Sequence, residues 1–447
     1  MSIILYLTIL IYFCPFQQLC YLWPYCLLSY IFLIYRFRIK LDFCSKWFLK
    51  WIFIGFVLFI TSSILNFSNI NNFFWSCITY GSFFVLFFAL LLIDTSKICF
   101  KKVFIWFFLL SFAQVFIGYY QMISAYNFST FNPFKLDMGA GDFFVGTLFV
   151  KWNSAILAVK LFMLLFILLF CLINRIKLSN IILVIFALFG CILPSSMTTV
   201  VCGVVSIIVY FLPDIKKNIL NLKVKKVYLY LIIFLCTFCI LNIIIQKDNV
   251  QYAENIIIST SKIVEGQYSV RKLIAYKNGF IDLFCENPLN AIWGVGPGNF
   301  SSRASALVSG NYLVNQPEYI HVTPAYYAEK YIIPLWQKSV DGSANQPYAS
   351  WLSVFSEYGI LGVSLFMLFF YKFFKTLNFI IKYDNVFYNN ICNGIALFSV
   401  FLMIIFFFDN WLEMPQVMGP YAVFAVLLIK HCSFLQKSVE IFNDKKT

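Results

Sequence analysis

The chain has 447 residues, of which 62% are hydrophobic, 21% aromatic and only 12% charged. Soluble globular proteins are roughly 45–50% apolar and about 25% charged, so this composition excludes a soluble enzyme and indicates a polytopic membrane protein. The net charge of +14 would suggest nucleic-acid binding in a soluble protein. In a membrane protein it is better explained by Lys and Arg retained in cytoplasmic loops, and we expect no nucleic-acid partner.

The cysteines and histidines do not indicate a metal centre. Most of the 14 Cys lie in apolar stretches, where Cys packs as a small hydrophobic residue. His321 and His431 are the only histidines, so we expect no metal and no other cofactor. The N-terminus lacks a basic region followed by a cleavage motif, so we interpret it as a first membrane span.

Apolar stretches predict an all-α architecture with about twelve transmembrane helices. A span needs about 20 apolar residues, or fewer where the bilayer thins. The predicted spans are Ile3–Cys14, Leu19–Tyr35, Trp51–Leu65, Phe73–Ile93, Val103–Ile123, Ser154–Ile173, Asn180–Leu193, Met197–Leu212, Val227–Ile245, Trp351–Tyr371, Ile391–Phe408 and Val417–Lys430.

The charges of the connecting loops predict the orientation. With the N-terminus in the cytoplasm, the cytoplasmic loops and tail carry 22 Lys and Arg, whereas the short outer loops carry only Lys135 and Lys151. Cationic loops resist translocation, so both termini are expected in the cytoplasm.

One long polar stretch, residues 246–350, interrupts this pattern on the outer face. Its eight basic and eight acidic residues balance, and long outer loops translocate largely regardless of charge. We expect a folded loop domain at 246–350 between spans 1–9 (residues 1–245) and spans 10–12 with the tail (residues 351–447). Within it, Ser269 can cap a helix over Val270–Cys285. The apolar face of that helix would lie on the membrane surface and comprises Leu273, Tyr276, Phe280, Ile281 and Phe284.

Four short motifs occur in order around this loop. They are Gly146-Thr147-Leu148-Phe149 with Asn153–Ala158, Ser269-Val270-Arg271 with Gly294–Phe300, Gln346–Leu352, and Glu357–Gly362. Together with the topology they resemble the O-antigen ligase and polymerase superfamily (Wzy-type polysaccharide polymerases and related ligases) over residues 140–371.

The resemblance implies an enzyme of the bacterial inner membrane that transfers a glycan from undecaprenyl diphosphate to an acceptor sugar. Its partners would be the undecaprenyl-diphosphate-linked oligosaccharide, membrane lipid, a chain-length regulator and a flippase. Ligases use a His nine residues before the motif Glu, but Tyr348 and Ala349 occupy that place here. The Ser-Arg that often begins a span before the large loop is replaced by Ser196-Met197. Both departures favour a polymerase.

Two outer arginines are the candidates for contact with the diphosphate. Guanidinium groups match phosphate oxygens bidentately, so no metal is required. Arg271 matches the family's Arg at the start of the interfacial helix, and Arg303 follows the glycine-rich turn. The alternative for Arg271 is an Arg that contacts solvent or lipid headgroups.

The base for the acceptor hydroxyl has several candidates. His321 is the only outer His, with an ordinary loop His as its alternative, and Glu318 and Asp282 are carboxylate alternatives.

Tyr348 is a candidate for contact with the substrate, as a hydrogen-bond donor to phosphate or sugar, or else it is a packing residue. Further candidate substrate contacts are Lys160, a charge inside a span that can also snorkel, and Trp293, an outer aromatic that can stack on sugars. The glycine-rich turn Gly294–Asn299 lacks the residues of a nucleotide-binding loop, and we interpret it as a tight structural turn.

Two other functions remain open from the sequence. One is an O-antigen ligase that transfers finished glycan to lipid A-core or protein. The other is a transporter or flippase of lipid-linked oligosaccharide, although the repeated halves common in transporters are not recognisable here.

Overall fold

The structure, a computed structural model, describes residues 2–35, 42–93, 100–125, 144–148, 154–194, 196–218, 271–309, 324–336 and 346–444. Within these ranges the chain is helical throughout and contains no strand, as the composition predicts. The principal helices before the polar stretch are α1 (Ser2–Ile11), α2 (Gln17–Tyr35), α3 (Phe43–Leu65), α4 (Ile70–Leu92), α5 (Phe100–Ala125), α6 (Ser154–Asn174), α7 (Leu178–Ile192) and α8 (Met197–Asn218). Those after it are α16 (Ser350–Tyr383), α17 (Val386–Ile405) and α18 (Pro415–Asp444).

Seven of the described helices are long and apolar enough to cross a membrane, namely α3, α4, α5, α6, α16, α17 and α18. The remaining predicted spans differ from this group. Helix α1 has ten residues and α7 has 15, so at 1.5 Å per residue they extend roughly 15 and 22 Å, less than the ~30 Å of a bilayer core. Helix α2 and the apolar part of α8 also fall outside the seven, and Val227–Ile245 lies outside the described residues.

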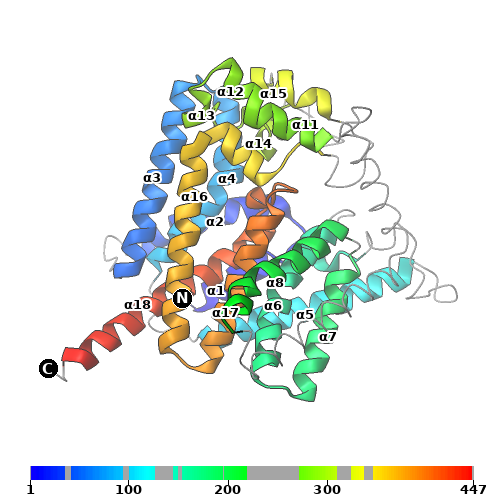
Figure 1. Ribbon diagram of the computed structural model, residues 1–447, viewed down its shortest axis with the longest axis vertical. Coiled ribbons are helices and arrows are strands. Elements are labelled where there is room, and N and C mark those ends of the chain that lie inside the picture. Colours follow the sequence, from blue (N-terminus) through cyan, green and yellow to red (C-terminus); the bar gives the residue numbers. More distant parts are fainter. Residues whose placement is uncertain are drawn as a thin grey trace.

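Helices α6 and α18 form the centre of the bundle. The apolar stretches of α6 and α18 are almost entirely buried, whereas most residues of α3 and α5 are half-buried or exposed. Helix α6 packs against α7 and α17, and α18 packs against α3, α4 and α16 (Figure 1). One continuous core of Phe, Leu and Ile side chains joins the two groups. A membrane-embedded bundle of this kind requires every backbone group to be paired within the helices.

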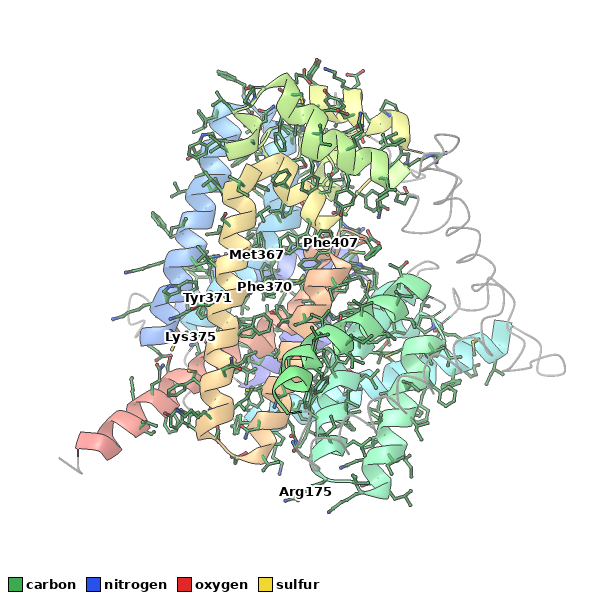
Figure 2. All side chains as sticks on the ribbon, in the orientation of Figure 1. Arg175, Met367, Phe370, Tyr371, Lys375 and Phe407 are labelled. Atoms are coloured by element: carbon green, nitrogen blue, oxygen red, sulfur yellow. The ribbon has the colours of Figure 1, made fainter. Side chains whose placement is uncertain are left out.

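The described parts of the polar stretch form short helices above one end of α3, α4 and α16 (Figure 1). We call residues 271–309 and 324–336 the cap. Its helices are α11 (Arg271–Lys277), a π-helical turn (Asn278–Asp282), α12 (Leu283–Glu286), α13 (Asn290–Trp293), α14 (Arg303–Val308) and α15 (Tyr326–Tyr331), followed by a 3-10 turn (Ile333–Leu335). A small core around Phe300 and Leu352 joins the cap to the start of α16. Arg175 lies at the opposite end of the bundle (Figure 2).

The predicted interfacial helix is present, as the continuous helical segment from Arg271 to Glu286. Its buried side carries Ala275, Gly279 and Leu283. Leu273, Phe280 and Ile281, on the predicted membrane-facing side, are exposed by 50%, 37% and 54%. The other two residues of that predicted face, Tyr276 and Phe284, are partly buried against the cap core. Phe280 and Phe284 also contact Phe355 of α16, so only part of this face is open.

Candidate functional site

A buried carboxylate, Glu357, organises the glycine-rich turn. Glu357 is fully buried in the second turn of α16, and it accepts hydrogen bonds from the backbone N–H groups of Gly298 (2.9 Å), Phe300 (3.2 Å) and Ser302 (3.1 Å). Three backbone donors stabilise a carboxylate that has been removed from solvent. The segment 298–302 therefore wraps around one side chain of the membrane bundle.

The same turn lies directly against the backbone of α16. The N–H groups of Val295 and Gly296 donate to the carbonyls of Ser356 (2.8 Å) and Glu357 (3.1 Å). Helix α16 is kinked at Gly359, which has φ +65°, and a Cβ there would come within 2.2 Å of the Ile292 carbonyl oxygen. Glycine is required because only it combines this conformation with so close a backbone approach. The turn is thus a structural element, as its sequence indicates.

A second buried carboxylate, Glu413, holds the first residue of α14. Both oxygens of Glu413 accept the backbone N–H of Arg303 at 3.0 Å, and Glu413 is only 1% exposed. The guanidinium of Arg303 is also buried, and its Nε donates to the Asn410 carbonyl at 3.3 Å. Asn410 in turn donates from Nδ2 to the Ser301 carbonyl at 3.0 Å. We call Arg303, Glu357, Asn410 and Glu413 the polar cluster.

Burial changes the acidity of this cluster. Removal from solvent raises the pKa of Glu413 from 4.5 to about 7, although the Arg303 backbone N–H and guanidinium partly oppose the shift. A carboxyl group with a pKa near neutrality exchanges protons readily at physiological pH, which is the property of a general acid or base. Glu413 lies in the 3-10 turn Trp411–Glu413, between α17 and α18.

Two concave surfaces adjoin the polar cluster. One is a small pocket in the cap, here called the serine pocket, which Tyr348 also lines. Tyr348 packs against Trp336 in a tilted arrangement with 5.4 Å between ring centroids, and burial holds the pKa of the phenol well above its usual value. The Arg303 charge acts on Tyr348 and partly opposes this shift. The residues that line the pocket are Phe300, Ser301, Ser302, Ser305, Ala306, Ser309, Ala328, Ile332, Ile333, Trp336 and Tyr348.

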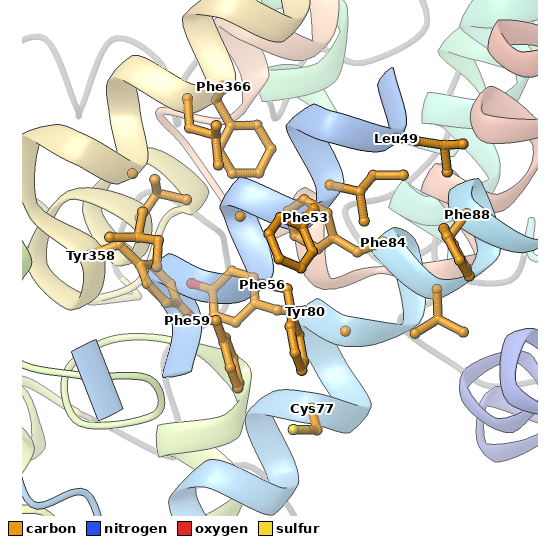
Figure 3. A pocket seen from close by; sticks show the side chains of 18 of the residues that line it. Leu49, Phe53, Phe56, Phe59, Cys77, Tyr80, Phe84, Phe88, Tyr358 and Phe366 are labelled. Carbon is orange, nitrogen blue, oxygen red and sulfur yellow. The ribbon is translucent and has the colours of Figure 1, made fainter. Parts of the chain in front are cut away.

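The other surface is an apolar groove of about 440 Å³ between α3, α4 and α16 (Figure 3). Phe, Leu, Ile and Val side chains make up most of its wall. Tyr80 and Tyr358 also line it, and both lie within electrostatic reach of Glu357 and Glu413. The polar cluster is therefore bordered by an apolar groove among the spans and by a serine-lined pocket in the cap.

The structure brings together some of the predicted site residues. Tyr348 lines the serine pocket and lies within electrostatic reach of Arg303. The backbone carbonyl of Trp293 accepts from Ser62 Oγ (2.8 Å), which also donates to the Glu357 carbonyl at 3.0 Å. Trp293 therefore lies beside the polar cluster.

Other predicted residues lie elsewhere. Asp282, a carboxylate alternative for the base, pairs with Lys277 at 3.1 Å on the surface of the cap. Lys160 does not snorkel: it is fully buried, its Nζ donates to the Tyr12 carbonyl, and it lies 4.5 Å from the centre of the Phe13 ring. Arg271 is half-buried at the start of α11. His321 and Glu318 lie outside the described residues.

Sequence reasoning missed Glu413 and gave no role to Glu357, although it quoted Glu357 within a motif. It also missed Lys272, a buried residue of α11 whose Nζ donates to the Phe408 carbonyl. Burial lowers the pKa of Lys272 to about 8, while the nearby Asp409 partly opposes the shift. Ionisable residues within or beside apolar spans are the signal that identifies such positions.

Within the described residues, no three His, Cys, Asp or Glu side chains gather as ligands for a metal ion. In comparisons with known proteins, no protein-family profile and no curated protein matches the sequence.

Proposed function

We propose that this protein is a membrane glycosyltransferase, a polymerase of O-antigen or a related surface polysaccharide. It would transfer the growing glycan from undecaprenyl diphosphate to a new lipid-linked repeat unit at the outer face of the bacterial inner membrane. In this proposal the chain has about twelve spans, both termini are cytoplasmic, and residues 246–350 face the periplasm.

The observation that carries the proposal is the position of the polar cluster between the apolar groove and the serine pocket. A lipid-linked sugar has an apolar chain, a charged diphosphate and a hydroxyl-rich glycan in that order. The groove adjoins the cluster at Tyr358, next to Glu357, and the serine pocket, of about 10 Å³, adjoins it at Ser302, next to Arg303. Aromatic rings and hydroxyl groups are suitable surfaces for sugars.

The reaction assigns a role to each part of the cluster. The acceptor hydroxyl oxygen bonds to the anomeric carbon of the donor, the bond from that carbon to the diphosphate oxygen breaks, and its electron pair leaves with the diphosphate. Arg303 stabilises the charge on the leaving group. Glu413 accepts the hydroxyl proton, because its pKa of about 7 permits proton transfer near neutral pH. His321 and Glu318 remain alternatives to Glu413 as the base.

Tyr348 favours polymerase over ligase. It occupies the place of the His on which the related ligases depend, and burial keeps its phenol protonated. A buried phenol of this kind donates a hydrogen bond but is a poor base at neutral pH. The residue at this position therefore suits contact with sugar or phosphate more than proton abstraction.

Deletion of the gene, followed by gel analysis of the surface glycan, tests the proposal. A core carrying a single repeat unit is the expected result for a polymerase. Free polymer indicates a ligase, and internal accumulation of lipid-linked units indicates a flippase. Complementation with Glu413→Gln tests the base, with Glu286→Gln on the cap surface as the matched control. If Glu413→Gln restores full polymer, the role of Glu413 is excluded.

A further inference from the structure

We infer that the apolar groove between α3, α4 and α16 holds the first isoprene units of the polyprenyl chain that carries the donor glycan. This inference rests on the proposed function and adds where the lipid binds and how it is oriented. The groove is lined by Tyr25, Leu49, Ile52, Phe53, Gly55, Phe56, Leu58, Phe59, Cys77, Tyr80, Gly81, Phe84, Val85, Phe88, Val354, Tyr358, Gly362, Leu365 and Phe366.

The groove runs parallel to the spans, which is the direction in which a lipid chain lies in a bilayer. Its wall extends from Phe59 to Leu49 along α3 and from Cys77 to Phe88 along α4. About ten residues at 1.5 Å per residue correspond to roughly 15 Å, measured along helices expected to cross the membrane. Figure 3 shows Phe59 and Cys77 at the same end as Tyr80 and Tyr358, and Leu49 and Phe88 at the other. The groove is thus parallel to the spans, with tyrosines at the end nearest the cap.

One side of the groove is exposed, so a lipid could enter it laterally from the bilayer. Phe53 and Phe56 on α3 are exposed by 67% and 58%, although both line the groove. In a membrane these rings would contact the bilayer, so a chain can enter laterally without crossing the cap. The bilayer supplies no polar partner at this depth, which suits a wall made of aromatic and aliphatic side chains.

The polar end of the groove indicates a headgroup. Tyr358 is only 7% exposed, and its hydroxyl oxygen is buried without a hydrogen-bond partner among the described residues. A buried hydroxyl costs free energy unless a partner satisfies it. Tyr358 directly follows Glu357 in α16, and its ring meets that of Tyr80 edge-on at 5.5 Å. A phosphate oxygen at the head of the chain would accept this hydrogen bond beside the polar cluster.

The volume sets how much of the chain fits. A cavity of about 150 Å³ takes one benzene, so 440 Å³ takes roughly three such groups, about 18 carbons or between three and four isoprene units. The rest of the chain would lie in the bilayer. A polyprenyl chain is favoured over the acyl chain of a bulk lipid because Tyr80 and Tyr358, at the end of the groove nearest the cap, lie within electrostatic reach of Glu357 and Glu413, where the donor must react in the proposed function.

Photolabelling tests the inference without using activity. The full-length protein in phospholipid nanodiscs is exposed to a C15 isoprenyl phosphate that carries a diazirine on its chain, and labelled residues are mapped by mass spectrometry. Labels are expected on the groove faces of α3, α4 and α16. Val85→Trp fills the groove and should reduce labelling about tenfold, equivalent to ~1.4 kcal/mol of binding. Val57→Trp is the matched control, because Val57 is exposed on α3 and does not line the groove.

A second variant covers the possibility that Val85→Trp fails to fold. Tyr358→Phe removes a hydroxyl that has no described partner, so folding is preserved. It should weaken binding of the isoprenyl phosphate roughly tenfold. It should leave labelling by the matching uncharged isoprenol unchanged.

Three results would overturn the inference. They are labelling elsewhere on the chain, equal labelling of Val85→Trp and Val57→Trp, or displacement of the probe by a C16 acyl phosphate as readily as by unlabelled isoprenyl phosphate. The proposed function fails separately, if the deletion strain still makes normal polymer while the groove is labelled as expected.

Discussion

The backbone N–H of Arg303 donates to both carboxylate oxygens of Glu413 at 3.0 Å, although the two residues are 110 positions apart in the sequence. This contact fixes the start of α14 on the short turn between α17 and α18. It buries a carboxyl group and a guanidinium in one site, where the guanidinium charge favours the ionised form of the Glu413 carboxyl. The position of Arg303 thus depends on its main chain as well as on the hydrogen bond from its Nε to Asn410.

Stability should depend on pH through Glu413. Its folded-state pKa of about 7 lies above the unfolded value of 4.5, so the folded chain binds the proton more tightly. The stabilisation is fully present below pH ~4.5, is lost as pH rises through 7, and amounts to about 3 kcal/mol at most. Thermal unfolding of the purified protein at pH 5.5 and 8 measures it. Glu413→Gln should abolish this part of the pH dependence, and Glu286→Gln should retain it. An unchanged pH dependence in Glu413→Gln would contradict the assignment.

Polymer formation should show the opposite pH trend. A base must be deprotonated, so the rate should rise with pH through about 7 while stability falls. A membrane assay with lipid-linked repeat units at pH 5.5 to 8.5 reveals the profile. In Glu413→Gln the rate should be low and almost independent of pH over this range. A normal profile in that variant would assign the base to another residue.

The Arg303→Lys variant should make about tenfold less polymer or lower still, a reduction nearly as severe as that of Arg303→Ala. Lysine keeps the charge but lacks the planar fork that holds two phosphate oxygens, and it lacks the Nε that donates to Asn410. Either variant retains the backbone contact with Glu413. Arg175→Lys, at the opposite end of the bundle, is the control and should leave polymer unchanged. Full-length polymer from Arg303→Lys would exclude the diphosphate role.

Glu357→Gln should destabilise the protein by about 2 kcal/mol. One carboxylate oxygen accepts from Gly298 and the other from Phe300 and Ser302, so an amide group in this site leaves at least one donor facing another donor. Thermal unfolding in detergent measures the loss. Glu286→Gln alters an exposed contact with Tyr331 and Lys330 and should change stability by less than ~1 kcal/mol. Equal melting temperatures for the two variants would show that the turn does not depend on Glu357.

Gly359→Ala should cost more than about 2 kcal/mol, because a side chain there combines positive φ with a clash against the Ile292 carbonyl. Gly55→Ala on α3 is the matched control. The added methyl group would lie 3.1 Å from a flexible Leu365 methyl group, in ordinary helical backbone. The expected change for Gly55→Ala is within ~1 kcal/mol. Limited proteolysis of the cap, compared between the two variants, shows whether the kink holds the cap in place.

Periodicity and apolar length predicted most of the helices but not the site. Eleven predicted spans coincide with helices because burial of apolar side chains is a local signal. The helix from Arg271 was predicted by the same means. Glu413 was not predicted: its position beside an apolar span marks it as a candidate, but it lies in a turn without a motif, and its contact with Arg303 is not visible in the sequence. The kink at Gly359 depends on the approach of Ile292, a contact between segments that no local pattern specifies.

The kink in α16 also determines which parts of the molecule move together. The carbonyls of Ser356 and Glu357 accept hydrogen bonds from the N–H groups of Val295 and Gly296. The N–H groups of Ser350 and Trp351 donate to the carbonyls of Asp409 and Phe406. The first two turns of α16 are therefore joined mechanically to the cap and to the end of α17, and the remainder of the helix begins after Gly359. A tilt of the cap would rotate these turns with it. Tyr358 is the last residue before the pivot, so such a tilt would shift the mouth of the groove.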